Sequence, residues 1–204
     1  MTRILLILLT LSSCSVITFG QFPSLAKDAI FGVDYEITEE IFNSQPYSFA
    51  KVLIGKSIVA ITVLSTVNNG VYTWVSADGE KIYTKDGKII ETFGLQNDMK
   101  IINSFNLQNI KFELIKSKEE AQERTFLIEL DNPHALMSQE TSFYNTGIDK
   151  NYFNSMLFEE RFETSKLKWE GVNYYWVDPQ GRVIKSVQNI HPRMPLVTIE
   201  FYYK

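Results

Sequence analysis

Cysteine, histidine and clustered basic residues are scarce in this sequence. Its 204 residues include 1 Cys and 2 His, which excludes an internal disulfide framework and any multi-cysteine zinc or iron–sulfur site. The 20 Lys and Arg residues are outnumbered by 24 Asp and Glu and form no block, which argues against nucleic acid as the main partner. With 10 Gly and 6 Pro, the chain cannot be collagen-like or dominated by linkers.

The apolar content is sufficient for a packed core. Hydrophobic residues make up 45% of the chain and charged residues 22%, a balance typical of globular rather than disordered proteins. The length favours one domain, with two small domains as the alternative. We find no repeat at a solenoid period and, after residue 32, no linker long enough to divide domains.

The N-terminus has the pattern of a bacterial lipoprotein signal. Arg3 makes the start positive, residues 4–9 (ILLILL) are apolar, and Leu11-Ser12-Ser13-Cys14 resembles a lipobox. We expect residues 1–13 to be a signal peptide and Cys14 to become the lipidated first residue of a single domain at 14–204. Ordinary cleavage further on remains an alternative. An uncleaved membrane helix is disfavoured, because a span needs about 20 mostly apolar residues.

Lipidation would attach the protein to a membrane through several acyl chains, palmitate among them, since one chain alone anchors only marginally. In the usual sorting of bacterial lipoproteins, a residue other than Asp after the Cys favours the outer membrane, and Ser15 is such a residue. We therefore expect an outer-membrane protein whose domain faces the periplasm.

The chain after residue 46 predicts antiparallel strands. Runs rich in Val, Ile, Thr and aromatic residues alternate with turn signals, and Asp78-Gly79 and Asp86-Gly87 each lie between two such runs, which is a strong hairpin signal. We expect strands at 47–54, 57–67, 71–75, 80–84, 88–92, 111–115, 124–130, 156–162, 171–177, 182–190 and 196–203. The fold class is mainly β, an antiparallel meander forming a sandwich or a flattened barrel.

A short helical segment is expected before the strands. Residues 23–31 could form a helix that ends at Gly32, and Thr38 is a suitable N-cap for a second helix because Glu39 and Glu40 follow it in the first turn.

Motifs of enzymes are weak or missing. Gly55-Lys56-Ser57 ends like a phosphate-binding loop, but Ala50 occupies the position of the leading Gly. There is no Gly-x-Ser-x-Gly motif for a nucleophilic serine. His134 and His191 both neighbour Pro and are expected in solvated loops.

Three aspartates could form a carboxylate pair of the kind that glycosidases use, but a structural role is favoured. Asp78, Asp86 and Asp178 each belong to an Asp-Gly or Asp-Pro turn, where a short acceptor side chain stabilises the turn itself. We expect no catalytic residue, no metal site and no cofactor.

Aromatic residues in strand-like segments are the main candidates for ligand contact. They are Trp74, Trp169, Tyr174, Tyr175, Trp176, Tyr202 and Tyr203. Aromatic faces suit the apolar faces of sugars. Because neighbours in a strand point to opposite faces, Tyr175 should face away from Tyr174 and Trp176. We take Trp74, Tyr174 and Trp176 as candidate ligand-binding residues, with packing in the core as the alternative.

Several segments, taken in order, also carry a family resemblance. They are Ile30-Phe31-Gly32, Ile37-Thr38, Gln45-Pro46-Tyr47, residues 74–79 (WVSADG), 86–89 (DGKI), 92–95 (TFGL) and 173–179 (NYYWVDP), then Gly181, Val183, Lys185-Ser186, Gln188, Pro192, Pro195 and Lys204. Together with the lipobox they resemble the YjbF/GfcB-type capsule lipoproteins. The resemblance is loose between about 100 and 165. Lys88 stands where that family commonly has Arg, and we expect it in a surface turn.

The resemblance implies an outer-membrane lipoprotein in exopolysaccharide or group 4 capsule production, without catalytic residues. Our main hypothesis is a non-enzymatic lipoprotein that assists assembly or secretion of the polymer by binding glycan or export partners. The alternative is a cell-envelope enzyme that trims or modifies the polysaccharide. The acidic composition disfavours electrostatic capture of an anionic polymer, so we expect glycan contact to depend on stacking and hydrogen bonds.

Overall fold

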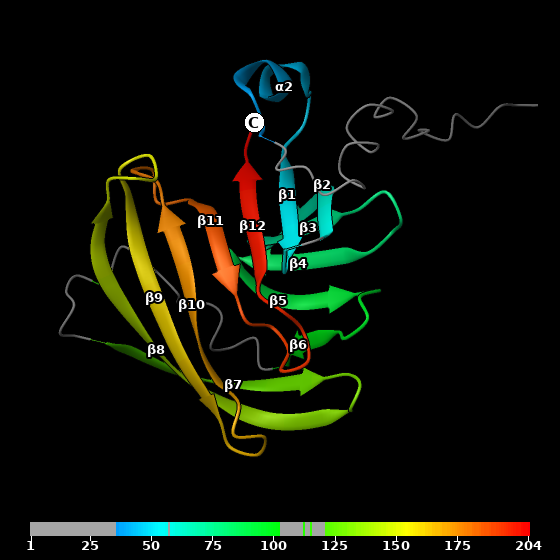
Figure 1. Cartoon of the computed structure of the whole chain (residues 1–204), viewed down its shortest axis with the longest axis vertical. Helices are drawn as coiled ribbons and strands as arrows, with labels where there is room; N and C mark the ends of the chain where they lie inside the picture. Colours follow the sequence, from blue (N-terminus) through cyan, green and yellow to red (C-terminus); the bar gives the residue numbers. More distant parts are fainter. Residues whose placement is uncertain (1–35, 57, 103–111, 113–114, 116–120) are drawn as a thin grey trace, which may run out of the picture.

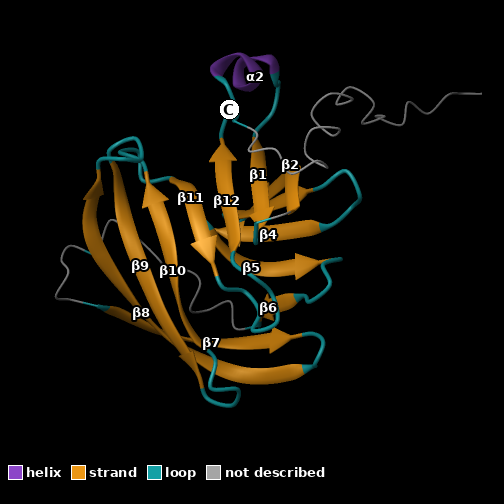
Figure 2. Ribbon diagram, in the orientation of Figure 1, coloured by secondary structure: helices purple, strands orange, loops and turns teal. Residues whose placement is uncertain are grey.

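The computed structural model describes residues 36–56, 58–102, 112, 115 and 121–204, and these residues are mostly strand (Figure 2). In chain order the strands are β1 (Phe49–Ile54), β2 (Ile58–Asn68), β3 (Val71–Val75), β4 (Lys81–Lys85), β5 (Lys88–Phe93), β6 (Met99–Ile101), β7 (Gln122–Leu130), β8 (Ala135–Asp149), β9 (Ser155–Thr164), β10 (Glu170–Val177), β11 (Val183–Gln188) and β12 (Val197–Tyr202). The expected meander is confirmed.

The sheet closes on itself to form a barrel. Each strand pairs antiparallel with its neighbours in the chain, and β1 pairs with β12 as well as with β2. In the closing pair Phe49 lies opposite Tyr202 and Ile54 opposite Val197. Figure 1 shows β8, β9 and β10 on one side and β1 to β6 on the other. Of the sandwich and the barrel that the sequence left open, the barrel is correct.

The interior of the barrel is filled by side chains that alternate along each strand. In β7, Phe126, Ile128 and Leu130 point inward and are at most 1% exposed. Trp74 from β3 and Tyr175 from β10 are buried to the same degree. Burial of such apolar surface is the main driving force for closing the sheet.

Helix α2 (Glu39–Ser44) covers the outside of the closing strands at one end of the barrel (Figure 1). The expected N-cap is confirmed, because the Thr38 side chain accepts a hydrogen bond from the Ile41 N–H at 3.3 Å. Phe42 of the helix packs on Phe49, which in turn stacks on Tyr202 at a centroid distance of 4.8 Å. The helix expected at 23–31 lies outside the described residues.

Two strands were not expected from the sequence, and one expected strand falls largely outside the described residues. β6 has only 3 residues. β8 has 15 residues, but its inward positions include Gln139 and Thr141, so the alternation of apolar and polar residues is diluted. Of the strand expected at 111–115, only Phe112 and Ile115 are described, and both are buried. Within the described ranges no helix is both long enough and apolar enough to cross a membrane.

Candidate functional site

A buried ion pair crosses the interior of the barrel. The Lys88 ammonium on β5 lies 2.6 Å from the Glu160 carboxylate on β9, and the two side chains are 5% and 0% exposed. The Lys88 ammonium also lies 5.1 Å from the centre of the Phe126 ring. The expectation that Lys88 occupies a surface turn is therefore wrong: it follows the Asp86-Gly87 turn, but its side chain enters the core.

The second oxygen of Glu160 is hydrogen-bonded as well. It accepts from the Asn173 amide at 3.0 Å and from the Tyr175 hydroxyl at 2.5 Å. Burial, reinforced by the negative charge of Glu160, raises the pKa of Tyr175 well above its usual value, so the hydroxyl remains a donor. The interior polar groups satisfy one another, as buried charges require.

Gln188 connects this network to the turn between β4 and β5. Its amide nitrogen donates to the Gly87 carbonyl at 2.9 Å, and its amide oxygen accepts from the Ile89 N–H at 3.0 Å. The Gly87 turn is thus bound to β11 across the interior.

The three aromatic candidates do not come together. Trp74 lies in the core, 1% exposed, and its indole N–H donates to the Thr84 hydroxyl at 2.9 Å. Tyr174 and Trp176 lie on the outer face of β10, partly exposed, with ring centroids 6.3 Å apart. Tyr175 points inward and is 0% exposed, so the predicted alternation of these three residues is confirmed.

Two further aromatic residues extend this pair. Tyr152 and Phe153 lie in the turn between β8 and β9, which the sequence analysis did not single out. The Tyr152 ring lies 5.8 Å from the Trp176 ring, and the Phe153 ring lies 5.0 Å from the Tyr152 ring. We call these four residues, Tyr174, Trp176, Tyr152 and Phe153, the aromatic track.

Charged side chains beside the aromatic track are paired. The Lys185 ammonium lies 4.6 Å from the centre of the Tyr152 ring and 5.3 Å from that of Trp176. It also lies 3.5 Å from the Glu200 carboxylate, which has Lys51 at 3.9 Å on its other side. These contacts reflect the sheet register, in which Glu200 is directly opposite both lysines.

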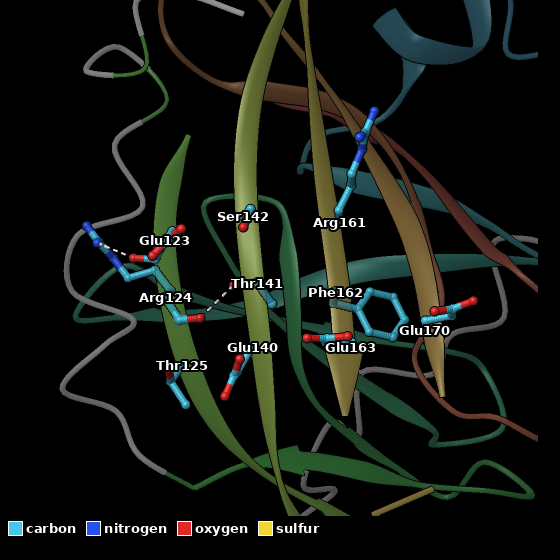
Figure 3. A pocket seen from close by; sticks show the side chains of 10 residues that line it. All are labelled: Glu123, Arg124, Thr125, Glu140, Thr141, Ser142, Arg161, Phe162, Glu163 and Glu170. Carbon is cyan, nitrogen blue, oxygen red and sulfur yellow. Dashed lines mark hydrogen bonds between the residues drawn. The ribbon is translucent and has the colours of Figure 1, made fainter. Parts of the chain in front are cut away.

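A hollow of about 390 Å³ lies over β7, β8, β9 and β10 (Figure 3). It is lined by Glu123, Arg124, Thr125, Glu140, Thr141, Ser142, Arg161, Phe162, Glu163 and Glu170. Glu163 is directly opposite Glu140 on one side and Glu170 on the other. Figure 3 shows Arg161 directed away from Glu163, and its guanidinium binds Glu159 at 2.5 Å instead.

The two histidines have different environments. His134 is exposed and lies 3.7 Å from Glu129. His191, expected in a solvated loop, is 1% exposed, so that expectation is wrong. Its Nε2 lies 2.8 Å from the Asp131 carbonyl, and its Nδ1 accepts from the Arg193 N–H at 3.1 Å. Burial lowers the pKa of His191, which is therefore a neutral structural residue.

The three turn aspartates have the local surroundings expected of them. Asp178 accepts from the backbone N–H groups of Gln180 and Arg182 at 3.0 and 2.8 Å. Asp86 has a positive φ of 48° before Gly87, and Asp78 lies in the turn between β3 and β4. Across the part of the chain that the structure describes, no group of three or more His, Cys, Asp or Glu side chains could hold a metal ion.

These features define a mainly β barrel protein whose core is filled and whose outer face carries an aromatic track. The chain belongs to the YjbF family, described as group 4 capsule polysaccharide lipoprotein GfcB, YjbF, whose model matches residues 23–202. Membership of a lipoprotein family implies association with a membrane.

A solved structure supports the same fold. It is the crystal structure of the hypothetical lipoprotein YmcC from Escherichia coli K12, at 20% sequence identity and a TM-score of 0.69, over 84% of this chain and 91% of that one. A comparison with curated proteins found no match.

Proposed function

We propose that the protein is a non-enzymatic outer-membrane lipoprotein that assists assembly or secretion of exopolysaccharide or capsule through contacts on its outer surface. The description of its family is group 4 capsule polysaccharide lipoprotein. The observation that carries the proposal is the filled barrel: Trp74, Phe126, Phe143 and Tyr175 occupy the interior at 0–1% exposure. The filled interior therefore favours contacts with a polymer or with export proteins on the outside, where the aromatic track lies.

Lipidation at Cys14 is the second part of the proposal. Cys14 is the sole cysteine of the chain and follows Leu11-Ser12-Ser13, and Ser15 after it favours the outer membrane. Intact-mass measurement of the purified membrane form tests the modification, and density-gradient fractionation tests the location. An N-terminus other than Cys14, or recovery with the inner membrane, contradicts this part.

The function is tested by surface polysaccharide in a deletion strain. We expect the deletion to reduce surface polysaccharide, the wild-type gene to restore it, and a Cys14→Ala form to restore it poorly. Full rescue by Cys14→Ala removes the requirement for the anchor. An unchanged polysaccharide level in the deletion strain contradicts the function itself.

The same strain separates this proposal from the enzymatic alternative. A cell-envelope enzyme would most often use acidic or histidine side chains for proton transfer. We expect that no single Asp, Glu or His substitution abolishes function while the protein remains folded. One variant with normal thermal stability and no activity would favour the enzyme.

A further inference from the structure

We propose that the aromatic track of Tyr174, Trp176, Tyr152 and Phe153 binds an uncharged stretch of a glycan chain by stacking. The proposal rests on the proposed function, and commits the outer-surface contact to sugar rather than to an export protein. It also adds Tyr152 and Phe153 to the two outer-face residues expected from the sequence.

The rings form a continuous series on the outer face. Successive centroids lie 6.3, 5.8 and 5.0 Å apart from Tyr174 to Phe153. The series begins on β10 and ends at the turn between β8 and β9, which Figure 1 shows at the same end of the barrel as α2. The ring planes are inclined by 45°, 58° and 83° at the three steps, so a polymer that follows the series would stack on some rings and contact the edges of others.

Hydrogen bonds hold Trp176 and the turn that carries Tyr152 in one arrangement. The Trp176 indole N–H donates to Asp149 at 2.8 Å, and the same carboxylate accepts from the Asn151 N–H at 2.9 Å. These two hydrogen bonds lower the pKa of Asp149, so it is a carboxylate at neutral pH. The Ser155 N–H donates to the Tyr152 carbonyl at 2.9 Å. A surface fixed before binding loses little conformational entropy when a ligand arrives.

Phe153 is the most exposed ring of the track. Its side chain is 80% exposed, and its backbone has a φ of +51°, followed by +49° at Asn154. A bulky residue in the left-handed region costs on the order of 1–3 kcal/mol, and such strain concentrates at binding sites. The ring packs on Tyr152 but covers no core, so stability of the barrel gives no account of it.

The charges beside the track favour an uncharged sugar. Lys185 and Lys51 both face Glu200, and Asp149 accepts a hydrogen bond from the Trp176 indole. The two cations and two anions around Trp176 balance one another, so this part of the track offers no excess positive charge to attract an acidic polymer or anionic lipid. Rings interleaved with polar groups suit sugars, whose apolar faces stack while their hydroxyls form hydrogen bonds.

The experiment measures binding of the purified membrane form in detergent to three probes. They are a neutral oligosaccharide series, an anionic one of equal length, and the surface polysaccharide isolated from the producing strain. We expect binding to neutral sugar, with a Kd that changes less than about twofold when salt rises from 0.05 to 0.5 M, since stacking is not screened. Loss of binding in high salt, or binding to the anionic series alone, overturns the inference.

Exposed aromatic residues provide matched variants. Phe153→Ala should weaken binding at least about fivefold, and Phe153→Ala with Tyr174→Ala at least about thirtyfold, because stacked rings contribute most of such contacts. Phe93→Ala is the control: Phe93 is 61% exposed at the end of β5, outside the track, and should bind as wild type. Equal loss in Phe93→Ala, or none in Phe153→Ala, overturns the inference.

Failure of this site is distinguishable from failure of the proposed function. If deletion of the gene lowers surface polysaccharide but the protein binds no sugar probe, the function stands and the glycan track is wrong. Export proteins would then be the remaining occupants of the outer surface. If deletion leaves the polysaccharide unchanged while the protein binds sugar, the track stands and the proposed function fails.

Discussion

The Lys88 ammonium and the Glu160 carboxylate meet 2.6 Å apart inside the barrel, although β5 and β9 are not neighbours in the sheet. The pair therefore connects two separate walls across the interior. Removing one partner leaves the other charge buried and unpaired, which is far more costly than losing an exposed ion pair.

We predict that Lys88→Ala lowers the free energy of unfolding by about 3–5 kcal/mol, measured by urea denaturation. The matched control is Lys100→Ala, because Lys100 pairs with Glu91 at 2.8 Å but is 50% exposed. The free energy of unfolding of that control should fall by about 0–1 kcal/mol.

A second variant tests whether the unpaired charge is the cause. Removing both charges in Lys88→Met with Glu160→Gln should restore part of the stability lost in Lys88→Ala, since no buried ion then lacks a partner. Equal losses for Lys88→Ala and Lys100→Ala would contradict the structural importance of the buried pair.

The two Asp-Gly turns should respond differently to the same substitution. Gly79 has a φ of +92° and nothing within 4 Å of an added Cβ, whereas a Cβ on Gly87 would lie 2.4 Å from Val183. Gly79→Ala should therefore lower the free energy of unfolding only by the backbone strain, about 1–2 kcal/mol, measured by thermal and urea unfolding. Gly87→Ala should cost more, and Gly87→Val should lower thermal stability further.

Asp86→Asn is the neutral comparison at the same turn. Asn tolerates the left-handed backbone that Asp86 adopts. The free energy of unfolding of Asp86→Asn should therefore stay within about 0.5 kcal/mol of the wild-type value. A stable Asp86→Asn protein that fails to restore surface polysaccharide would revive a chemical role for this carboxylate.

Local patterns in the sequence predicted the local features of the barrel. The period of two along a strand correctly separated Tyr175 from Tyr174 and Trp176, and the Asp-Gly pairs correctly located two hairpins. Closure of the barrel could not be predicted in the same way, because it depends on pairing between β1 and β12 at opposite ends of the described chain. No local pattern specifies that contact.

The wrong expectations for Lys88 and His191 also arise from contacts between residues that are distant in sequence. Lys88 follows an Asp-Gly pair and His191 precedes Pro192, and both were expected at the surface. Their partners are distant, because Glu160 is 72 positions away from Lys88 and Asp131 is 60 positions away from His191. Partners so distant in sequence decide which side chain is buried. Tyr152 and Phe153 were missed because turn residues carry no facial periodicity; two adjacent aromatics inside a turn were the available signal.

The glutamates that line the hollow over β7, β8, β9 and β10 should lower the stability of the protein. Glu163 lies directly opposite Glu140 and Glu170, and among the described residues none of the three has an ion-pair partner. Like charges opposite one another on adjacent strands are destabilising. We predict that Glu163→Gln raises the free energy of unfolding by about 0.2–1 kcal/mol at low salt, measured by urea denaturation.

Salt provides the check on this cause. The gain from Glu163→Gln should shrink as ionic strength rises, because the repulsion is screened. Glu123→Gln is the control, since Glu123 lies opposite Ser142 rather than an acid, and its stability should remain near that of wild type. A gain independent of salt would point to packing rather than charge.

His191 should make stability depend on pH in a narrow range. Burial lowers its pKa in the folded protein below the usual value of about 6.5, so the unfolded chain binds a proton more readily than the folded one. Stability is then full above pH 6.5, falls as pH drops from that value toward the folded pKa, and levels off below it. Protonation would also place a proton on Nδ1, where the Arg193 N–H now donates.

We predict that the free energy of unfolding of the wild type, measured in urea at each pH, decreases between about pH 7.5 and 5, and that His191→Gln reduces this slope. Gln keeps a donor for the Asp131 carbonyl but does not titrate. His134→Gln is the matched control for the loss of a histidine, because the His134 side chain is 69% exposed, and His191→Gln should reduce the slope more than this control does. An identical slope in wild type and His191→Gln would show that the buried imidazole is not the group that responds to acid.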